Sequence, residues 1–104
     1  MEIQFNTDKN IEGKERIENY FTKKLNEDLE RFEDRLTRIE VHLSDENGDK
    51  SGERDKKCVL EARPEGLKPV VVSSYDDTVE KAISGASQKL KSSLTKLIGK
   101  LQKH

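Results

Sequence analysis

The side chains with the clearest chemical use in this chain are lysines near its carboxyl end. Residues 78–104 contain six lysines and one acidic residue, whereas the other 77 residues carry 14 basic and 20 acidic side chains. Ammonium groups bind phosphate oxygens, so this local excess of positive charge predicts a surface for a polyanion on an acidic body. An ordinary solvated helix face explains the charge count about equally well. The lysines are Lys81, Lys89, Lys91, Lys96, Lys100 and Lys103.

Most of these lysines share one face of a predicted helix. At about 100° per residue, all except Lys91 fall within an arc of about 100° opposite the apolar stripe. With a rise of about 5.4 Å per turn, Lys89 to Lys103 would span roughly 20 Å, which is several phosphate spacings. Such a row would recognise backbone and shape, not base sequence. A second basic row is predicted on an earlier helix, and it comprises Lys24, Arg31 and Arg35, with Arg16 and Lys23 nearby.

Groups that could support catalysis are few. The single cysteine, Cys58, is expected on the inward side of a strand, where thiols are usually structural. His42 is expected on the outward side of a strand, and the sequence gives it no positioned partner. The sequence contains no phosphate-binding loop, nucleophile elbow, dinucleotide-binding fingerprint or zinc-protease motif. We therefore predict a protein that is not an enzyme, with no catalytic residues and no small-molecule substrate.

A short acidic stretch allows a calcium-site interpretation. Asp45, Asn47 and Asp49 match the first three ligand positions of an EF-hand loop. The later positions fail, because Lys50 stands where the loop needs glycine and Lys56 stands where it needs a bidentate glutamate. No helix is predicted before this stretch. We therefore predict neither a metal ion nor another cofactor.

Length and composition narrow the class of protein. The chain has 104 residues, enough for one domain and too few for two. It is 31% hydrophobic and 39% charged, but its net charge of −1 and its patterned apolar residues argue against disorder. No run approaches 18 apolar residues and the first residues are neither basic nor apolar, so no membrane span or secretory signal is expected. A single cysteine fits a reducing compartment, and we expect a cytoplasmic protein.

The elements that must position these side chains follow from the spacing of apolar residues. Alternation predicts strands, and recurrence at three and four residues predicts helices. The stretch 46–56 contains no apolar residue and is expected to be a mobile loop. The predicted strands are 1–7, 37–45, 57–63 and 67–74, and the predicted helices run from 14 to about 36 and from 78 to about 101. The helical stripes are Ile17, Phe21, Leu25, Leu29, Phe32 and Leu36, and Val79, Ile83, Ala86, Leu90, Leu94, Leu97 and Leu101.

The resulting order, β-α-β-β-β-α, limits the possible architectures. A strand, helix and strand in succession can form a parallel pair through a right-handed crossover, and the last two strands form a hairpin. Each helix has one apolar stripe and each strand has one polar face. We therefore predict an α+β fold with a four-stranded sheet, two helices packed on one face and the other face in water. Gly85 lies off the helical stripe, and the apolar pattern offers no packing reason for it.

The order of elements, the length and the final helix resemble the ribosome hibernation-promoting factor and ribosome-associated inhibitor A family. Its members are also called ribosomal subunit interface proteins or sigma-modulation proteins. The resemblance covers essentially the whole chain. Four stretches carry it, and the one at 82–97 is similar to the family's helix signature, Lys-Leu-x-x-x-Leu-x-Lys-Leu. The stretches are IEVHLSDENG (39–48), CVLEARPEG (58–66), PVVVSS (69–74) and AISGASQKLKSSLTKL (82–97).

The resemblance implies a function. It implies a bacterial stress-response protein that binds the small ribosomal subunit through rRNA, occupies the mRNA and tRNA sites and silences translation in ribosome hibernation. It implies one domain over 1–104, of the short form, without the C-terminal dimerisation domain of long members. By position it matches Lys89, Lys96 and Lys100 on the second helix and Lys23, Lys24 and Arg31 on the first. Lys81, from the lysine arc, completes the predicted RNA-binding set.

An alternative from a different functional class is a protein-interaction module that keeps this fold without binding rRNA. Its working surfaces would be the acidic loop and the outward face of the sheet. The residues expected on that face are Arg38, Glu40, His42, Glu61 and Arg63.

Overall fold

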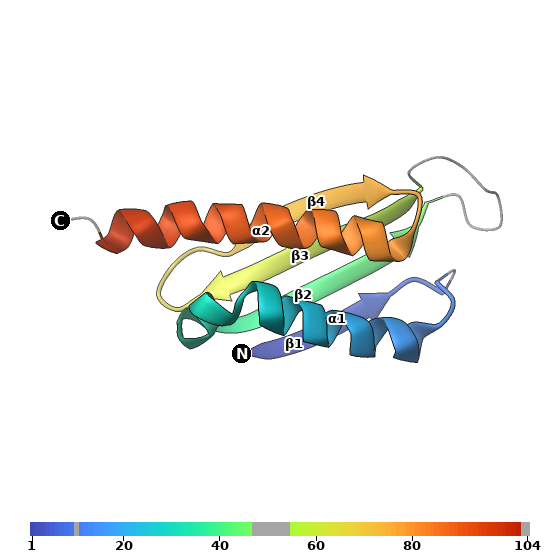
Figure 1. The fold of residues 1–104 in the computed structure, drawn as a ribbon, viewed down its shortest axis with the longest axis horizontal. Helices are drawn as coiled ribbons and strands as arrows, with labels where there is room; N and C mark the ends of the chain where they lie inside the picture. The colour runs from blue at the N-terminus through green and yellow to red at the C-terminus, as the bar shows by residue number, and fades with distance from the viewer. Residues whose placement is uncertain (10, 47–54, 103–104) are drawn as a thin grey trace.

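A computed structural model describes residues 1–9, 11–46 and 55–102 of the protein, with side chains as far as Gly99. Figure 1 shows two long helices lying on the same face of a four-stranded sheet, which confirms the predicted α+β architecture. A short 3₁₀ helix, η1, links the first helix to the second strand. The elements are β1 (Glu2–Thr7), α1 (Lys14–Asp28), η1 (Glu30–Arg35), β2 (Leu36–Asp45), β3 (Lys56–Pro64), β4 (Val70–Asp76) and α2 (Val79–Gln102).

The strands lie in the order β1-β2-β3-β4, so β1 and β4 form the two edges of the sheet. β1 and β2 are parallel, as predicted for a strand-helix-strand crossover, and the other two pairs are antiparallel. The register places Phe5 opposite Val41, Val41 opposite Leu60, and Leu60 opposite Val72. Because side chains alternate along each strand, this register aligns one apolar row beneath the helices.

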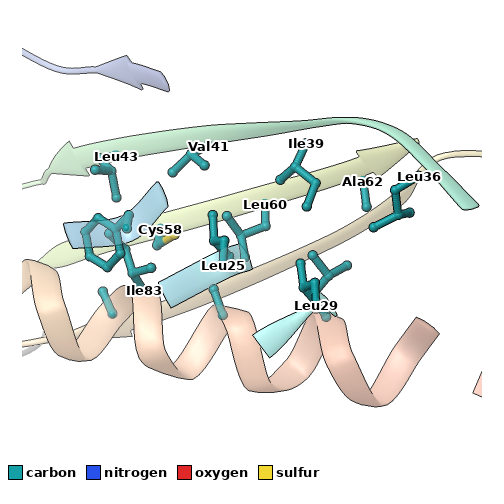
Figure 2. Packing of buried hydrophobic residues seen from close by; sticks show 14 of the residues in the cluster. Leu25, Leu29, Leu36, Ile39, Val41, Leu43, Cys58, Leu60, Ala62 and Ile83 are labelled. Carbon is teal, nitrogen blue, oxygen red and sulfur yellow. The ribbon is translucent and has the colours of Figure 1, made fainter. Parts of the chain in front are cut away.

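The core lies between the sheet and the two helices. The apolar stripe of α1 is buried, and Figure 2 shows Leu25 and Leu29 pointing into the same space as Leu60 and Ile83. Each such side chain contributes about 1.5–3 kcal/mol through removal of its apolar surface from water. This burial holds both helices in place on the sheet.

The first helix ends earlier than predicted. α1 stops at Asp28, and the segment to Arg35 is a 3₁₀ helix in which the Phe32 N–H donates to the Leu29 carbonyl at 2.9 Å. Leu29 and Phe32 are buried in this geometry, so the apolar spacing could not separate the two helix types. The tighter 3₁₀ turns allow the chain to reverse before Leu36 starts β2.

Other element boundaries also differ from the prediction. β3 covers Lys56–Pro64 instead of 57–63, and β4 covers Val70–Asp76 instead of 67–74. Pairing of the two strands extends to the first residue of β3, where Lys56 lies opposite Asp76. On α2, Ile98 is buried and Leu97 is half-buried, so Ile98 takes the place in the stripe that was predicted for Leu97. The side chain of Leu101, the last predicted member, lies outside the described ones. Of the predicted mobile loop 46–56, residues 47–54 lie outside the described residues.

Candidate nucleic-acid interface

The lysines of α2 differ in what their ammonium groups contact. Thr78 starts the helix by accepting a hydrogen bond from the Lys81 N–H at 3.1 Å. The ammonium of Lys81 lies 3.4 Å from the carboxylate of Asp77, so its charge is largely compensated. Lys89 donates instead to the backbone carbonyl of Ser73 at 2.7 Å, and a neutral acceptor leaves its positive charge in place.

Lys96 is the α2 lysine of the predicted set whose ammonium has no described partner. Its side chain is exposed, and no described carboxylate lies within ion-pairing distance of it or of Lys89. Lys91 is half-buried, in agreement with its predicted position off the arc. The prediction for Lys100 concerns a side chain outside the described ones. Lys89 and Lys96 therefore form the described part of a cationic row on α2.

The basic residues of the first helix do not form the continuous row that was predicted. Lys23 is exposed on α1, whereas the Lys24 ammonium lies 3.2 Å from the Asp28 carboxylate. Arg31 belongs to η1 and not to α1, and its guanidinium lies 5.0 Å from the centre of the Phe32 ring. The end of α1 at Asp28 is the physical reason, since η1 turns at a different angle per residue.

The lysine row of α2 and the basic residues of α1 lie on different sides of α2. Lys89 contacts β4, at one edge of the sheet. Ser87, two residues earlier, is fully buried and donates to the Asp28 carboxylate of α1 at 2.7 Å. Figure 1 shows the same arrangement, with α1 along one side of α2 and β4 along the other. The structure therefore places Lys89 on a different side of α2 from the α1 lysines. Arg31 and Arg35 of η1 instead line a hollow together with Thr95 and Gly99 of α2.

The groups considered for catalysis lie where the sequence predicted them. Cys58 is fully buried, and burial raises the pKa of its thiol from 9.0 to about 12. A thiol that holds its proton at neutral pH is a poor nucleophile. His42 is exposed on the open face of the sheet. Among the described residues we find no nucleophile with a positioned base.

Lys56 pairs with Asp45, the first position of the rejected EF-hand pattern, whereas Asn47, Asp49 and Lys50 of that pattern lie outside the described residues. The Lys56 ammonium lies 3.2 Å from Asp45 and 3.1 Å from Asp55, and both carboxylates are buried. The hydrogen bond to Asp55 is the main reason that the pKa of Lys56 is raised above its ordinary 10.5. The residue that broke the EF-hand pattern in the sequence thus places an ammonium between two carboxylates.

The charged residues that the sequence placed on the outward face of the sheet form a network, and only their pairing was not predicted. Glu40 and Glu61 are direct cross-strand partners, and Arg63 bridges them at 3.3 and 3.2 Å. Single oxygen or nitrogen atoms of Glu40, His42 and Glu61 also lie within 4.8 Å of one another. Arg38 also lies 3.9 Å from Glu40, so two guanidinium groups face two carboxylates. This network is therefore electrically balanced and does not favour a polyanion.

Tyr20 is a site residue that the sequence did not single out. It lies on α1 beside the buried stripe, and 46% of the residue is exposed. It lines a hollow of about 300 Å³ together with Lys23, Lys24 and Glu27. A signal existed in the sequence, because Tyr20 lies one position away from the stripe and only three and four residues from two lysines.

The family described as sigma 54 modulation protein / S30EA ribosomal protein matches residues 5–102. The chain belongs to this family. The resemblance inferred from the sequence is thereby confirmed, and the match runs from within β1 to the end of α2. No curated protein matches the chain.

Two solved structures share the fold. The N-terminal domain of Thermus thermophilus Protein Y has a TM-score of 0.72 and 23% identity, covering 93% of this chain and 99% of its own. A ribosomal subunit interface protein from Coxiella burnetii has a TM-score of 0.68 and 17% identity, covering 95% and 99%. At these identities the likeness establishes the fold alone. Within the described part of this family member, no helix combines the length and apolar character needed to cross a membrane.

Proposed function

We propose that this protein is a translation inhibitor that binds the small ribosomal subunit in the bacterial cytoplasm. It contacts rRNA through basic side chains and occupies the channel of mRNA and tRNA, as a hibernation factor under stress. Inhibition is steric and requires no chemistry, in keeping with the buried, protonated Cys58. The observation that carries the proposal is the pair of exposed α2 lysines, Lys89 and Lys96, whose charges no described carboxylate compensates.

Electrostatic binding of this kind depends steeply on salt. Each phosphate contact releases condensed counterions, so six to ten contacts would weaken binding by about 10³–10⁵ between 50 and 200 mM salt. Two or three engaged lysines would give a shallower dependence. The proposed RNA-binding set remains Lys23, Lys24, Arg31, Lys81, Lys89, Lys96 and Lys100.

The test is cosedimentation of purified protein with small ribosomal subunits. Changing Lys89, Lys96 and Lys100 to Glu should abolish binding and should leave the circular dichroism spectrum unchanged. A matched control carries the same change in charge elsewhere, on the exposed lysines Lys9, Lys14 and Lys68. The control should bind like the wild type. Equal loss in both variants would reduce the effect to net charge and refute the α2 site.

A second candidate function is a protein-interaction module that uses the open sheet face. The observation in its favour is that this face combines the balanced Arg63 network with two exposed apolar residues of β4, Val71 and Tyr75. Such a mixture fits a protein partner better than RNA. Purification of the tagged protein from stationary-phase cells distinguishes the two. rRNA and small-subunit proteins are expected, whereas one non-ribosomal protein without rRNA would favour the module.

A further inference from the structure

Tyr20 presents an aromatic ring to solvent from a fixed position on α1. Its ring centre lies 5.1 Å from that of Phe21, at an interplanar angle of 77°. Phe21 is fully buried in the core, so the pair holds the tyrosine ring against an immobile neighbour. Because 46% of Tyr20 remains exposed, part of its ring is available to a ligand.

The hollow beside this ring is an open depression on the surface of α1. Its volume of about 300 Å³ lies at the lower end of the range for ligand pockets, which suits one flat ring system. Lys23 and Lys24 lie one helical turn after Tyr20, and Glu27, about one turn further along α1, is the fourth lining residue. Lys24 is engaged by Asp28 at 3.2 Å, so Lys23 is the cation available to an anion. No described cation pairs with Glu27.

Three kinds of group thus converge on one helix face. An aromatic ring stacks on nucleobases, an ammonium binds phosphate, and a carboxylate accepts a hydrogen bond from an exocyclic amine. Cytosine carries such an amine at position 4, where uracil carries a carbonyl. We infer that the Tyr20 hollow binds one unpaired nucleobase of RNA, with the adjoining phosphate on Lys23 and with Glu27 favouring cytosine over uracil.

This inference rests on the proposed function and deepens it. The α2 lysines supply contacts to the RNA backbone, which carry no base information. The Tyr20 hollow adds one base contact on the other helix. This contact should fix the orientation of the domain on the RNA, and it requires a nucleotide that is single-stranded or flipped out of its helix.

The composition of the chain permits a direct optical test. The protein has two tyrosines and no tryptophan, so Tyr75→Phe leaves Tyr20 as the sole tyrosine emitter. This variant is titrated with tetracytidylate and, as the matched ligand, tetrauridylate at one salt concentration. Saturable quenching with tighter binding of the cytidine oligomer is expected. Adding Glu27→Met should equalise the two affinities. Absence of quenching by both oligomers up to millimolar concentration would overturn the inference.

Binding to small subunits separates this inference from the proposed function. Tyr20→Ala should weaken binding roughly 5- to 150-fold without changing its salt slope, since one stacked base contributes about 1–3 kcal/mol. Tyr20→Phe should bind like the wild type. If Tyr20→Ala has no effect while the α2 triple variant loses binding, the base site is wrong and the proposed function stands. If quenching occurs but the triple variant still binds subunits, the proposed interface fails and the base site stands.

Discussion

Gly85 of α2 lies against Ser74 of β4. A Cβ atom on residue 85 would lie 3.3 Å from the Cβ of Ser74 and closer still to its hydroxyl oxygen. The missing side chain lets the helix approach the edge strand closely. One turn further along α2, Lys89 can then reach the carbonyl of Ser73 at 2.7 Å. Gly85 therefore has the packing reason that the apolar pattern could not supply.

The two glycines within α2 should respond in opposite ways to alanine. Gly99 has no atom within 4 Å of its would-be Cβ, so Gly99→Ala should stabilise the protein by about 0.5–1 kcal/mol through helix propensity. Gly85→Ala should lose that gain to the clash with Ser74 and destabilise the protein by about 1 kcal/mol. Urea unfolding measures both free energies. Equal stabilisation by both substitutions would show that α2 does not need the close approach.

Asp28 limits the positive charge of the first helix. It holds the Lys24 ammonium at 3.2 Å and accepts the hydrogen bond of buried Ser87 at 2.7 Å. Asp28→Asn keeps an acceptor for Ser87 and frees Lys24, so the salt slope of ribosome binding should steepen by about 0.7–0.9. Asp28→Ala should instead cost about 1–3 kcal/mol of stability, because it leaves the Ser87 hydroxyl without an acceptor. An unchanged slope for Asp28→Asn would exclude Lys24 from the interface.

The α2 lysines should differ in their contribution to binding. Lys96→Ala removes an uncompensated charge and should lower the salt slope by about 0.7–0.9, with weaker binding at every salt concentration. Lys81→Ala should have a smaller effect, because the Asp77 carboxylate already lies 3.4 Å from Lys81. Fluorescence anisotropy of labelled protein with small subunits, from 50 to 200 mM salt, gives both slopes. A larger effect at Lys81 than at Lys96 would contradict the assigned order.

Cys58 should make stability depend on pH in the alkaline range. Burial raises the pKa of its thiol to about 12 in the folded state, whereas the unfolded value is close to 9.0. Between these values only the unfolded state ionises, so stability is fully present below pH 9 and is lost as pH rises toward 12, by about 4 kcal/mol. Cys58→Ala should lack this component in urea unfolding across that range. At pH 8 the native thiol should resist alkylation until the protein unfolds.

Lys56 should stabilise the end of the sheet where β2 and β3 meet the loop. Lys56→Met would leave the buried carboxylates of Asp45 and Asp55 without their shared ammonium and should cost about 2–4 kcal/mol. The pKa of Lys56 is raised in the folded state, so this contribution is fully present below pH 10.5 and disappears above its raised value. Thermal unfolding at pH 7 and pH 11 measures both effects. A variant as stable as the wild type at pH 7 would show that the cluster contributes little.

The interior of the fold was largely predictable. Ile39, Val41 and Leu60 alternate with polar neighbours and are all fully buried, because a strand with one wet face imposes that period. The same pattern could not place the end of α1, since Leu29 and Phe32 are buried equally well by α-helical and 3₁₀ turns. The end of a helix could not be predicted where α-helical and 3₁₀ turns both bury apolar residues at the same spacing.

The candidate site was less predictable. Three lysines of similar helical position have different surroundings. Lys81 pairs with a carboxylate, Lys89 donates to a backbone carbonyl, and Lys96 is exposed without a described carboxylate nearby. The neighbours of Lys81 are local and could have been found, because Asp77 precedes it by four residues. The partner of Lys89 lies sixteen residues away and depends on how α2 packs against β4.

Periodicity along the chain was enough to specify the order of strands and helices, their inward faces and the burial of Cys58, because apolar burial acts on each element separately. The count of charged residues along the chain also located the lysines that carry the excess positive charge. The hydrogen bond from Lys89 to Ser73 and the role of Gly85 depend on contacts between elements distant in sequence. Such contacts arise only when the helices pack on the sheet, since packing determines which side chains come within a few ångströms of each other.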